Sequence, residues 1–156
     1  MNVELRPVDD MNREACIGLK VKPEQAECVA SNEKSLKQAL EKPAIARPFA
    51  IYADDQLVGF TMFAFDDFED EDGYYHWLWR FMIDSDHQGK GYGKAAMKEI
   101  IEYFKVNGAK TVALSTEEHN SSAIALYESF GFRKTGQVND GETVFILEFG
   151  KAWKSE

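Results

Sequence analysis

The sequence contains few cysteines, few histidines and no long apolar run. Its two cysteines, Cys16 and Cys28, are too few for a disulfide framework, so we expect free thiols in a reducing, cytoplasmic environment. No apolar run approaches the length that crosses a bilayer, and the opening MNVELRPVDD lacks the basic start and apolar core of a signal peptide. The three histidines and two cysteines show none of the usual ligand spacings, so we expect no metal site.

Basic residues are also in the minority. The chain has 18 Lys and Arg against 27 Asp and Glu, which gives a formal net charge of -9. A nucleic-acid footprint needs a basic surface, and anionic membranes repel an acidic one, so neither is an expected partner. The acidity is compatible with a cationic partner, or with solubility alone.

What is present is enough for one ordinary domain. The 156 residues are 44% hydrophobic and show no internal repeat or low-complexity linker, so we expect a single domain over 1–149 and a short tail over 150–156. Apolar periodicity and turn residues predict strands at 3–5, 48–53, 57–65, 74–83, 111–116, 133–138 and 143–149, and helices around 10–20, 32–42, 91–106 and 121–130. This order predicts an α+β fold with a mixed sheet rather than a doubly wound Rossmann sheet.

Several polar residues are candidates for helix caps. Ser31 or Asn32 precedes the second expected helix, and Asn120 precedes the last one. Gly131 follows the last helix, where a glycine often ends helical structure.

A glycine-rich turn, QGKGYG at 88–93, follows a strand and begins a helix. Glycines let backbone N–H groups approach a ligand, and a helix start favours anions, phosphate above all. Lys90 and Lys94 add positive charge nearby. The turn lacks the Gly-Lys-Ser/Thr ending of a Walker loop, and it lies mid-chain, unlike most dinucleotide fingerprints. We therefore predict a phosphate or pyrophosphate cradle, with a purely structural turn as the alternative.

A second segment, NSSAIALYESFGF at 120–132, lies about thirty residues downstream. Asn120 and Tyr127 are seven residues apart, close to two helical turns, so both side chains are expected on one helix face.

Together, FMIDSDHQGKGYG and NSSAIALYESFGF resemble the two motifs of the GCN5-related N-acetyltransferase (GNAT) family, and the element order agrees over nearly the whole chain. The resemblance implies a GNAT fold, with a twisted mixed sheet of six to seven strands and about four helices, and acetyl-CoA as the cosubstrate. It also implies that pantetheine pairs with the backbone of Phe81, Met82 and Ile83. It places Asn120 against the cofactor and Tyr127 near the thioester sulfur. The pyrophosphate would lie on the backbone of Gln88, Gly89, Lys90, Gly91, Tyr92, Gly93 and Lys94.

Acyl transfer to an amine forms an oxyanion and then a thiolate. A backbone N–H near Met82 or Ile83 is a candidate to stabilise the oxyanion. Tyrosine has an unperturbed pKa near 10, so Tyr127 is the candidate acid that protonates the departing thiolate. The alternative is that Tyr127 only packs as a half-buried residue of its helix.

The acceptor is suggested by DDFEDED at 66–72, which has six acids in seven residues. This run is either a solvated loop or a site that steers a polycation. With the segments LVGFTMF, DED, RFMID, QGKG and YESFGF, the chain is most similar to bacterial spermine/spermidine acetyltransferases within the family. This resemblance implies a polyamine as the acceptor.

One position departs from that pattern. Trp79 stands where comparable members often carry a carboxylate, and with Trp77 it forms an aromatic wall that could hold an ammonium but not accept a proton. A polyamine nitrogen is protonated at pH 7 and needs a base. The candidate bases are Glu71, Asp72, His76, Glu117 and His119. All of them except His119 are also candidate substrate contacts.

Arg80 either pairs with the acidic run or is an ordinary surface residue.

Three alternatives stay open. The first is a GNAT enzyme with another amine as acceptor, such as an aminoglycoside, an amino acid or a protein N-terminus. The second is a non-catalytic acyl-CoA sensor, and the third is a structural module that uses Trp77, Trp79 and Trp153 as an interface. The aromatic content is also compatible with a homodimer.

Overall fold

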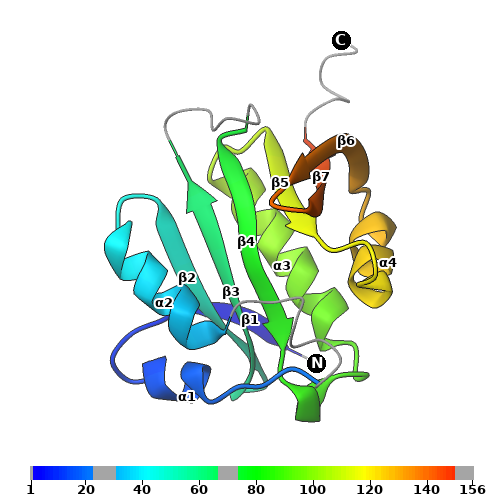
Figure 1. Ribbon diagram of the computed structural model, residues 1–156. Helices are drawn as coiled ribbons and strands as arrows, with labels where there is room; N and C mark the ends of the chain where they lie inside the picture. The colour runs from blue at the N-terminus through cyan, green and yellow to red at the C-terminus, as the bar shows by residue number, and fades with distance from the viewer. Residues whose placement is uncertain (1, 23–30, 67–73, 150–156) are drawn as a thin grey trace.

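The computed structural model forms one seven-stranded sheet with the strand order β1-β2-β3-β4-β5-β7-β6 (Figure 1). The structure describes residues 2–22, 31–66 and 74–149. Neighbouring strands are antiparallel except β4 and β5, which are parallel, so the sheet is mixed. The strands are β1 (Val3–Pro7), β2 (Ala46–Ala53), β3 (Gln56–Phe65), β4 (His76–Ile83), β5 (Thr111–Thr116), β6 (Arg133–Asn139) and β7 (Glu142–Glu148).

Helices cover both faces of the sheet (Figure 1). On one face, α1 (Arg13–Ile17) and α2 (Asn32–Glu41) pack through Cys16 and Leu36 against Phe60 and Met62 of β3. On the other face lie α3 (Tyr92–Val106) and α4 (Ser121–Ser129), whose core includes Met97, Phe104 and Tyr127. The expected α+β architecture with a mixed sheet is confirmed.

Local sequence signals explain most helix boundaries. Ser31 caps α2, because its hydroxyl oxygen accepts a hydrogen bond from the Lys34 N–H at 3.2 Å. The first helix is shorter than the expected 10–20: α1 covers only five residues and ends before Gly18. Cys16 on that helix is a buried free thiol, and burial raises its pKa to about 11. Cys28 lies outside the described residues.

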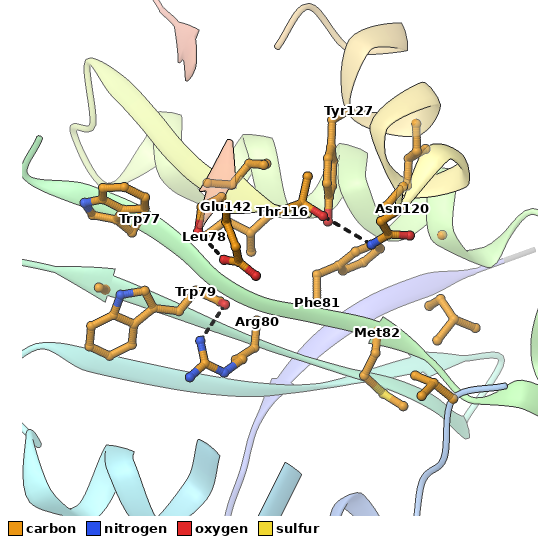
Figure 2. Close-up of a pocket in the computed structure, with 18 of the residues that line it drawn as sticks. Trp77, Leu78, Trp79, Arg80, Phe81, Met82, Thr116, Asn120, Tyr127 and Glu142 are labelled. Carbon is orange, nitrogen blue, oxygen red and sulfur yellow. Dashed lines mark hydrogen bonds between the residues drawn. The ribbon is translucent and has the colours of Figure 1, made fainter. Parts of the chain in front are cut away.

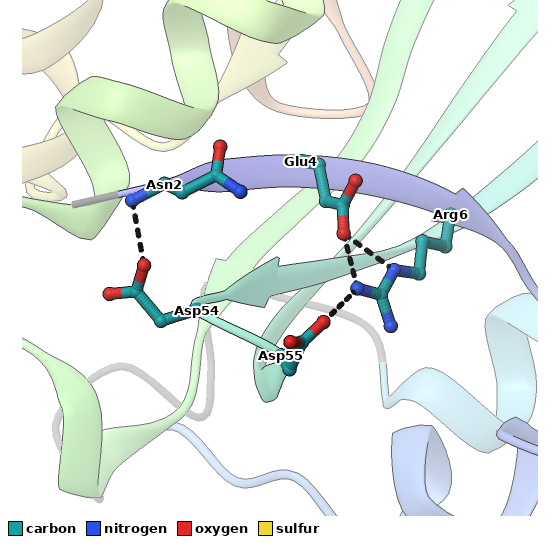
Figure 3. A network of polar contacts seen from close by, with 5 residues as sticks. All are labelled: Asn2, Glu4, Arg6, Asp54 and Asp55. Atoms are coloured by element: carbon teal, nitrogen blue, oxygen red, sulfur yellow. Dashed lines mark hydrogen bonds and ion pairs between the residues drawn. The ribbon is translucent and has the colours of Figure 1, made fainter.

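The edge strand β1 is fastened to the β2–β3 hairpin by polar contacts (Figure 3). Asp54 and Asp55 form the turn with positive φ angles of 48° and 68°, which aspartate tolerates better than most residues. The backbone N–H of Asn2 donates to Asp54 Oδ1 at 3.0 Å. Arg6 donates to Asp55 Oδ1 at 2.6 Å and also to Glu4. These contacts hold the end of the hairpin against the edge of the sheet.

A β-bulge in β4 changes which side chains share a face. Arg80 is opposite Met62 and Leu78 is opposite Phe63, so Trp79 is the extra residue in this ladder. Trp79 therefore lies on the α2 side together with Arg80, although the two residues are adjacent in sequence.

The sheet also opens between its two parallel strands. The one Cα pair between β4 and β5 joins Trp77 to Ala113, and beyond it the strands diverge. Each antiparallel pair has at least four register pairs, whereas this parallel pair has one, so the middle of the sheet is wedge-shaped. No helix within the described ranges is long and apolar enough to cross a membrane.

Candidate active site

A cleft of about 750 Å³ lies where β4 and β5 diverge (Figure 2). One wall is β4 from Trp77 to Ile83, and the other is formed by the end of β5, by α4 and by the start of β7. Among the expected cofactor and substrate residues, those that line it are Trp79, Phe81, Met82, Ile83, Gln88, Gly89, Tyr92, Gly93, Asn120 and Tyr127. The structure therefore brings the two sequence motifs together across one opening.

The glycine-rich turn has the geometry of an anion cradle. Gly89 and Gly91 have φ angles of 78° and 86°, in the left-handed region that favours glycine. A Cβ built on Gly89 would meet nothing within 4 Å, so the turn leaves open space above its backbone. Gly91 is the N-cap of α3 and offers no side-chain acceptor, so the first N–H groups of this helix are uncapped. These features fit a pyrophosphate group.

The lysines of the turn lie away from the main cleft. Lys94 lines a second, shallow hollow beside α3, with Gly91 and Lys98. Lys90 is exposed and lines neither hollow.

The residues before the turn hold it in place. The side-chain amide of Gln88 donates to the carbonyl oxygen of Ile83 at 2.9 Å. Asp84 accepts from the Lys20 N–H at 2.9 Å, and its other oxygen lies 3.1 Å from Nδ1 of His87. Burial acts to raise the pKa of Asp84, but the hydrogen bonds from Lys20, His87 and the backbone of Asp86 outweigh it and hold the pKa below its ordinary value.

Asn120 and Tyr127 both line the cleft from α4, as expected from their seven-residue spacing. Asn120 is the N-cap of α4 by position, but its side chain does not cap the helix; it donates from Nδ2 to Thr116 Oγ1 at 3.2 Å (Figure 2). Tyr127 is buried, and its hydroxyl has no hydrogen-bond partner among the described residues. Burial, and next the negative charge of Glu142, raise the pKa of Tyr127 well above its ordinary value. Tyr127 therefore stays protonated at neutral pH.

The expected aromatic wall of Trp77 and Trp79 is present, and two cationic side chains lie beside Trp79. Trp77 is buried with only 7% of its surface exposed, so it cannot serve as an exposed interface residue. Lys42 Nζ lies 6.0 Å from the centroid of the Trp79 ring. Arg80 donates to Ser35, Gln38 and the carbonyl oxygen of Trp79 at 2.9–3.0 Å, and burial lowers its pKa. Arg80 is thus tied to α2 rather than being an ordinary surface arginine.

The expected bases are not gathered in the cleft. His76 lies on the opposite face of β4 from Trp77 and packs edge-on against Phe65, with a centroid distance of 4.7 Å. Burial, and next the charge of Arg47, lower the pKa of His76. Glu117 and His119 pair with each other at 3.1 Å and do not line the cleft.

Parts of the acidic run and of the tail cannot be placed in this geometry. Glu71, Asp72 and Trp153 lie outside the described residues. Asp66, the first residue of the acidic run, is described and lines the cleft.

Two carboxylates in the cleft, Asp140 and Glu142, were missed by the sequence analysis. Glu142 begins β7 and accepts a hydrogen bond from Ser115 Oγ at 2.7 Å (Figure 2). In sequence it is an ordinary acid after the hairpin turn Asp140-Gly141. The signal that places it is the pairing of β7 with β5, which sets Thr143 opposite Thr116.

Comparison with known proteins places this geometry in a family. The model of the acetyltransferase (GNAT) family matches residues 12–132, most of the chain. The chain belongs to the GNAT acetyltransferase family. It is therefore an acetyl-CoA-dependent N-acetyltransferase, and the family resemblance of the two motifs is confirmed.

Full-length relatives agree with the family. The GNAT chain is 36% identical over 152 residues to the spermine/spermidine N(1)-acetyltransferase of Bacillus subtilis (strain 168), covering 95% of this chain and 99% of that protein. The PaiA N-acetyltransferase of Thermoplasma acidophilum, solved with coenzyme A, matches with a TM-score of 0.73 at 17% identity, over 96% of this chain and 100% of that one. The aminoglycoside acetyltransferase AAC(6')-Ib, also solved with coenzyme A, matches with a TM-score of 0.77 at 15% identity, over 99% and 98%.

Proposed function

We propose that this GNAT enzyme transfers the acetyl group of acetyl-CoA to a primary amine of a polyamine such as spermine or spermidine. The observation that carries the proposal is the 36% identity, over nearly the full length of both chains, to a spermine/spermidine N(1)-acetyltransferase. The acceptor end of the cleft adds support, because it combines Trp79 with the carboxylates of Asp66, Asp140 and Glu142. Aromatic faces and carboxylates together suit a chain of methylenes and ammonium groups.

The residues of the cleft have complementary roles in this reaction. The backbone of the 88–94 turn and the uncapped start of α3 bind the pyrophosphate, and the free edge of β4 at 81–83 pairs with pantetheine. Asn120 contacts the cofactor from α4. Acetyl-CoA, when bound, supplies the activated acetyl group. Tyr127 then gives its hydroxyl proton to the departing sulfur, which is the role its raised pKa permits.

A second acceptor class follows from the cations of the cleft. Arg80 and Lys42 both line it beside Trp79, and each favours an acceptor that carries an anionic group. An α-amino acid has such a carboxylate near its amine, and a peptide N-terminus has a neutral carbonyl there whose oxygen can accept a hydrogen bond. These acceptors are the alternative to a polyamine.

Free-thiol release from acetyl-CoA by the purified protein separates the two. The acceptors are spermine, spermidine, putrescine, an aminoglycoside, lysine and a short peptide, each at about 50 and 300 mM salt. We expect the highest kcat/KM with spermine or spermidine and a decrease in salt, because screening weakens attraction between a polycation and an acidic site. Turnover confined to lysine or the peptide would replace the polyamine by the second class. Tight acetyl-CoA binding without turnover on any acceptor would indicate a sensor.

A further inference from the structure

Glu142 occupies a central place in the cleft that no sequence motif assigns. It is the first residue of β7, and its carboxylate points into the cleft from the wall opposite β4 (Figure 2). Ser115 of β5 donates from Oγ to Glu142 Oε1 at 2.7 Å, which fixes the orientation of the carboxylate. The second oxygen, Oε2, has no hydrogen-bond partner among the described residues and is available to a ligand.

The charge of Glu142 affects the pKa values of groups on both sides of the cleft. Burial is the main cause of the raised pKa of Tyr127 on α4, and the charge of Glu142 adds to it. Burial lowers the pKa of Arg80 on β4, and the charge of Glu142 opposes that shift. A single carboxylate that acts on both groups lies near the candidate acid and near the acceptor wall at once.

The negative charge of Glu142 has no ion-pair partner in the described part of the chain. Arg80, the cation on the β4 wall of the cleft, directs its guanidinium to Ser35, Gln38 and the carbonyl oxygen of Trp79 instead. Unlike Glu148 on the same strand, which pairs with Arg133 at 2.6 Å, Glu142 lacks a cation of the protein itself. An ammonium group of the acceptor would supply one.

We infer that Glu142 binds the acceptor ammonium and accepts its proton, an inference that rests on the function proposed above. The proton passes from R–NH3⁺ to the carboxylate of Glu142, directly or through one water, which leaves R–NH2 with a free electron pair. That pair forms the N–C bond to the acetyl carbonyl carbon as the C–S bond breaks. Tyr127 protonates the sulfur, and the nitrogen loses its second proton to restore the tyrosine. Glu142 finally releases its proton to solvent, so one proton leaves per turnover.

The other carboxylates and histidines fit this role less well. His76 lies on the other face of β4, and Glu117 is paired with His119 away from the cleft. Asp140 lines the cleft but sits in an exposed turn, one residue before Gly141. Of the described acids, Glu142 alone both lines the cleft and contributes to the raised pKa of Tyr127.

The test is Glu142→Gln, which keeps an oxygen that can accept from Ser115 but removes the charge. General-base catalysis contributes about 10²–10⁴-fold, so kcat/KM for the best amine at pH 7.5 should fall by at least about 10²-fold. The titratable or charged groups that face Glu142 are Arg80, Tyr127 and Asp140, and the raised pKa of Tyr127 keeps it protonated up to pH 10. The deficit should therefore shrink as the pH approaches about 10.4, where the alkylammonium loses its proton unaided.

Two further measurements separate catalysis from structure. Calorimetric binding of the amine without acetyl-CoA should weaken at least about tenfold in Glu142→Gln, as expected for loss of a charge-assisted contact, while acetyl-CoA affinity and the unfolding temperature stay the same. Glu148→Gln, the matched change on the same strand outside the cleft, should retain wild-type kcat/KM. Wild-type kcat/KM and amine affinity in Glu142→Gln, or a deficit that is constant from pH 7.5 to 10, would overturn the inference.

The same experiment distinguishes failure of the proposed function. If the wild-type protein acetylates a different amine, the polyamine proposal fails and Glu142→Gln is scored on that amine. If the wild-type protein acetylates no amine at all, both proposals are overturned.

Discussion

At the scale of single residues, Tyr127 combines burial with an isolated hydroxyl. Its ring packs near Phe132 with a centroid distance of 5.9 Å, while its hydroxyl faces the cleft without a described partner. The packing surface and the candidate acid group are therefore different parts of one side chain. The sequence alone left these two roles as alternatives, and the structure is compatible with both at once.

Tyr127→Phe isolates the hydroxyl. The ring packing remains and no described hydrogen bond is lost, so the unfolding temperature should not fall. If Tyr127 is the acid, kcat should fall by about 10²-fold or more, while acetyl-CoA affinity measured by calorimetry changes less than twofold. Tyr52→Phe, a tyrosine under the Arg6 guanidinium and outside the cleft, is the matched control. Equal kcat in wild type and Tyr127→Phe would remove the acid role.

Asp84 gives a residue-scale prediction for pH. Its pKa is lower in the folded protein than its ordinary value of 3.8, so the carboxylate stabilises the fold above that value and the contribution is lost as pH falls through the folded pKa. Asp84→Asn should lower the free energy of unfolding by about 1 kcal/mol at pH 7, in line with the loss of a charged hydrogen-bond acceptor.

Denaturant unfolding of both proteins from pH 7 to pH 3 checks this. The difference between them should be constant from pH 7 to about 5 and narrow below pH 4, where Asp84 of the wild type takes up a proton. A difference that is independent of pH would show that the charge of Asp84 does not contribute.

At the scale of elements, the start of α3 depends on its backbone conformation. Gly91 has a φ angle of 86° at the N-cap, whereas Gly93 is helical and a Cβ there would lie 3.8–3.9 Å from Ile83, Leu126 and Phe81. An alanine at 91 would therefore be strained by the left-handed backbone, whereas an alanine at 93 would only make ordinary contacts.

Gly91→Ala should strain the turn by about 1 kcal/mol and weaken acetyl-CoA binding about tenfold or more, because the uncapped N–H groups no longer converge. Gly93→Ala should be tolerated, with affinity within about twofold of wild type. Calorimetry with acetyl-CoA, together with thermal unfolding, measures both effects. Equal affinities of the two variants would contradict the cradle assignment.

Elements with strong local signals were predictable from the sequence. The β2–β3 hairpin, the periodic helix α3 and the cap at Ser31 follow from alternation, spacing and a hydroxyl at the right place. The glycine-rich turn at 88–93 was predictable as a turn for the same reason, since Gly89 and Gly91 adopt the conformations that only glycine adopts easily. Its binding of phosphate stays a prediction.

Features that depend on strand pairing were not predictable. The bulge that sets Trp79 beside Arg80 is a property of the β3–β4 ladder, not of either strand. Glu142 reaches the cleft because β7 pairs with β5, two strands that are separated in sequence by α4 and β6. His76, one of the candidate bases, packs against Phe65 on the face of β4 opposite Trp77, and this placement likewise depends on strand pairing.

At the scale of the whole molecule, the net charge differs from the charge distribution inside the cleft. The net charge of -9 includes six acids concentrated at 66–72, whereas the cleft contains both acids and the cations Arg80 and Lys42. Acceptor choice therefore depends on how these few groups are placed rather than on overall acidity. Cytoplasmic location and homodimer formation remain predictions from the sequence.

The domain limits can be tested directly. The last described residue, Phe149, donates its backbone N–H to the Lys110 carbonyl at 2.8 Å, and its ring lies under Lys105 at 5.6 Å. We expect a protein ending at Phe149 to fold with an unfolding temperature within about 2 °C of the full chain, because the last few residues of a domain commonly tolerate removal. Acetyl-CoA affinity should be the same for both lengths. A larger loss of stability would extend the domain beyond 149.

The single Cα pair between β4 and β5 affects how the two parts of the sheet unfold. Strands β1–β4 and strands β5, β7 and β6 form two half-sheets that share one backbone register pair. Two apolar clusters also join them: the core under α3, and a second cluster that includes Trp77, Ala113 and Ile146. Such halves can open as separate cooperative units, and native-state hydrogen exchange would then give each its own opening free energy. A ligand that bridges the wedge ties the two units together. The candidate active site thus lies at the boundary between the two half-sheets. A ligand bound there would couple them, so that the domain unfolds as one cooperative unit.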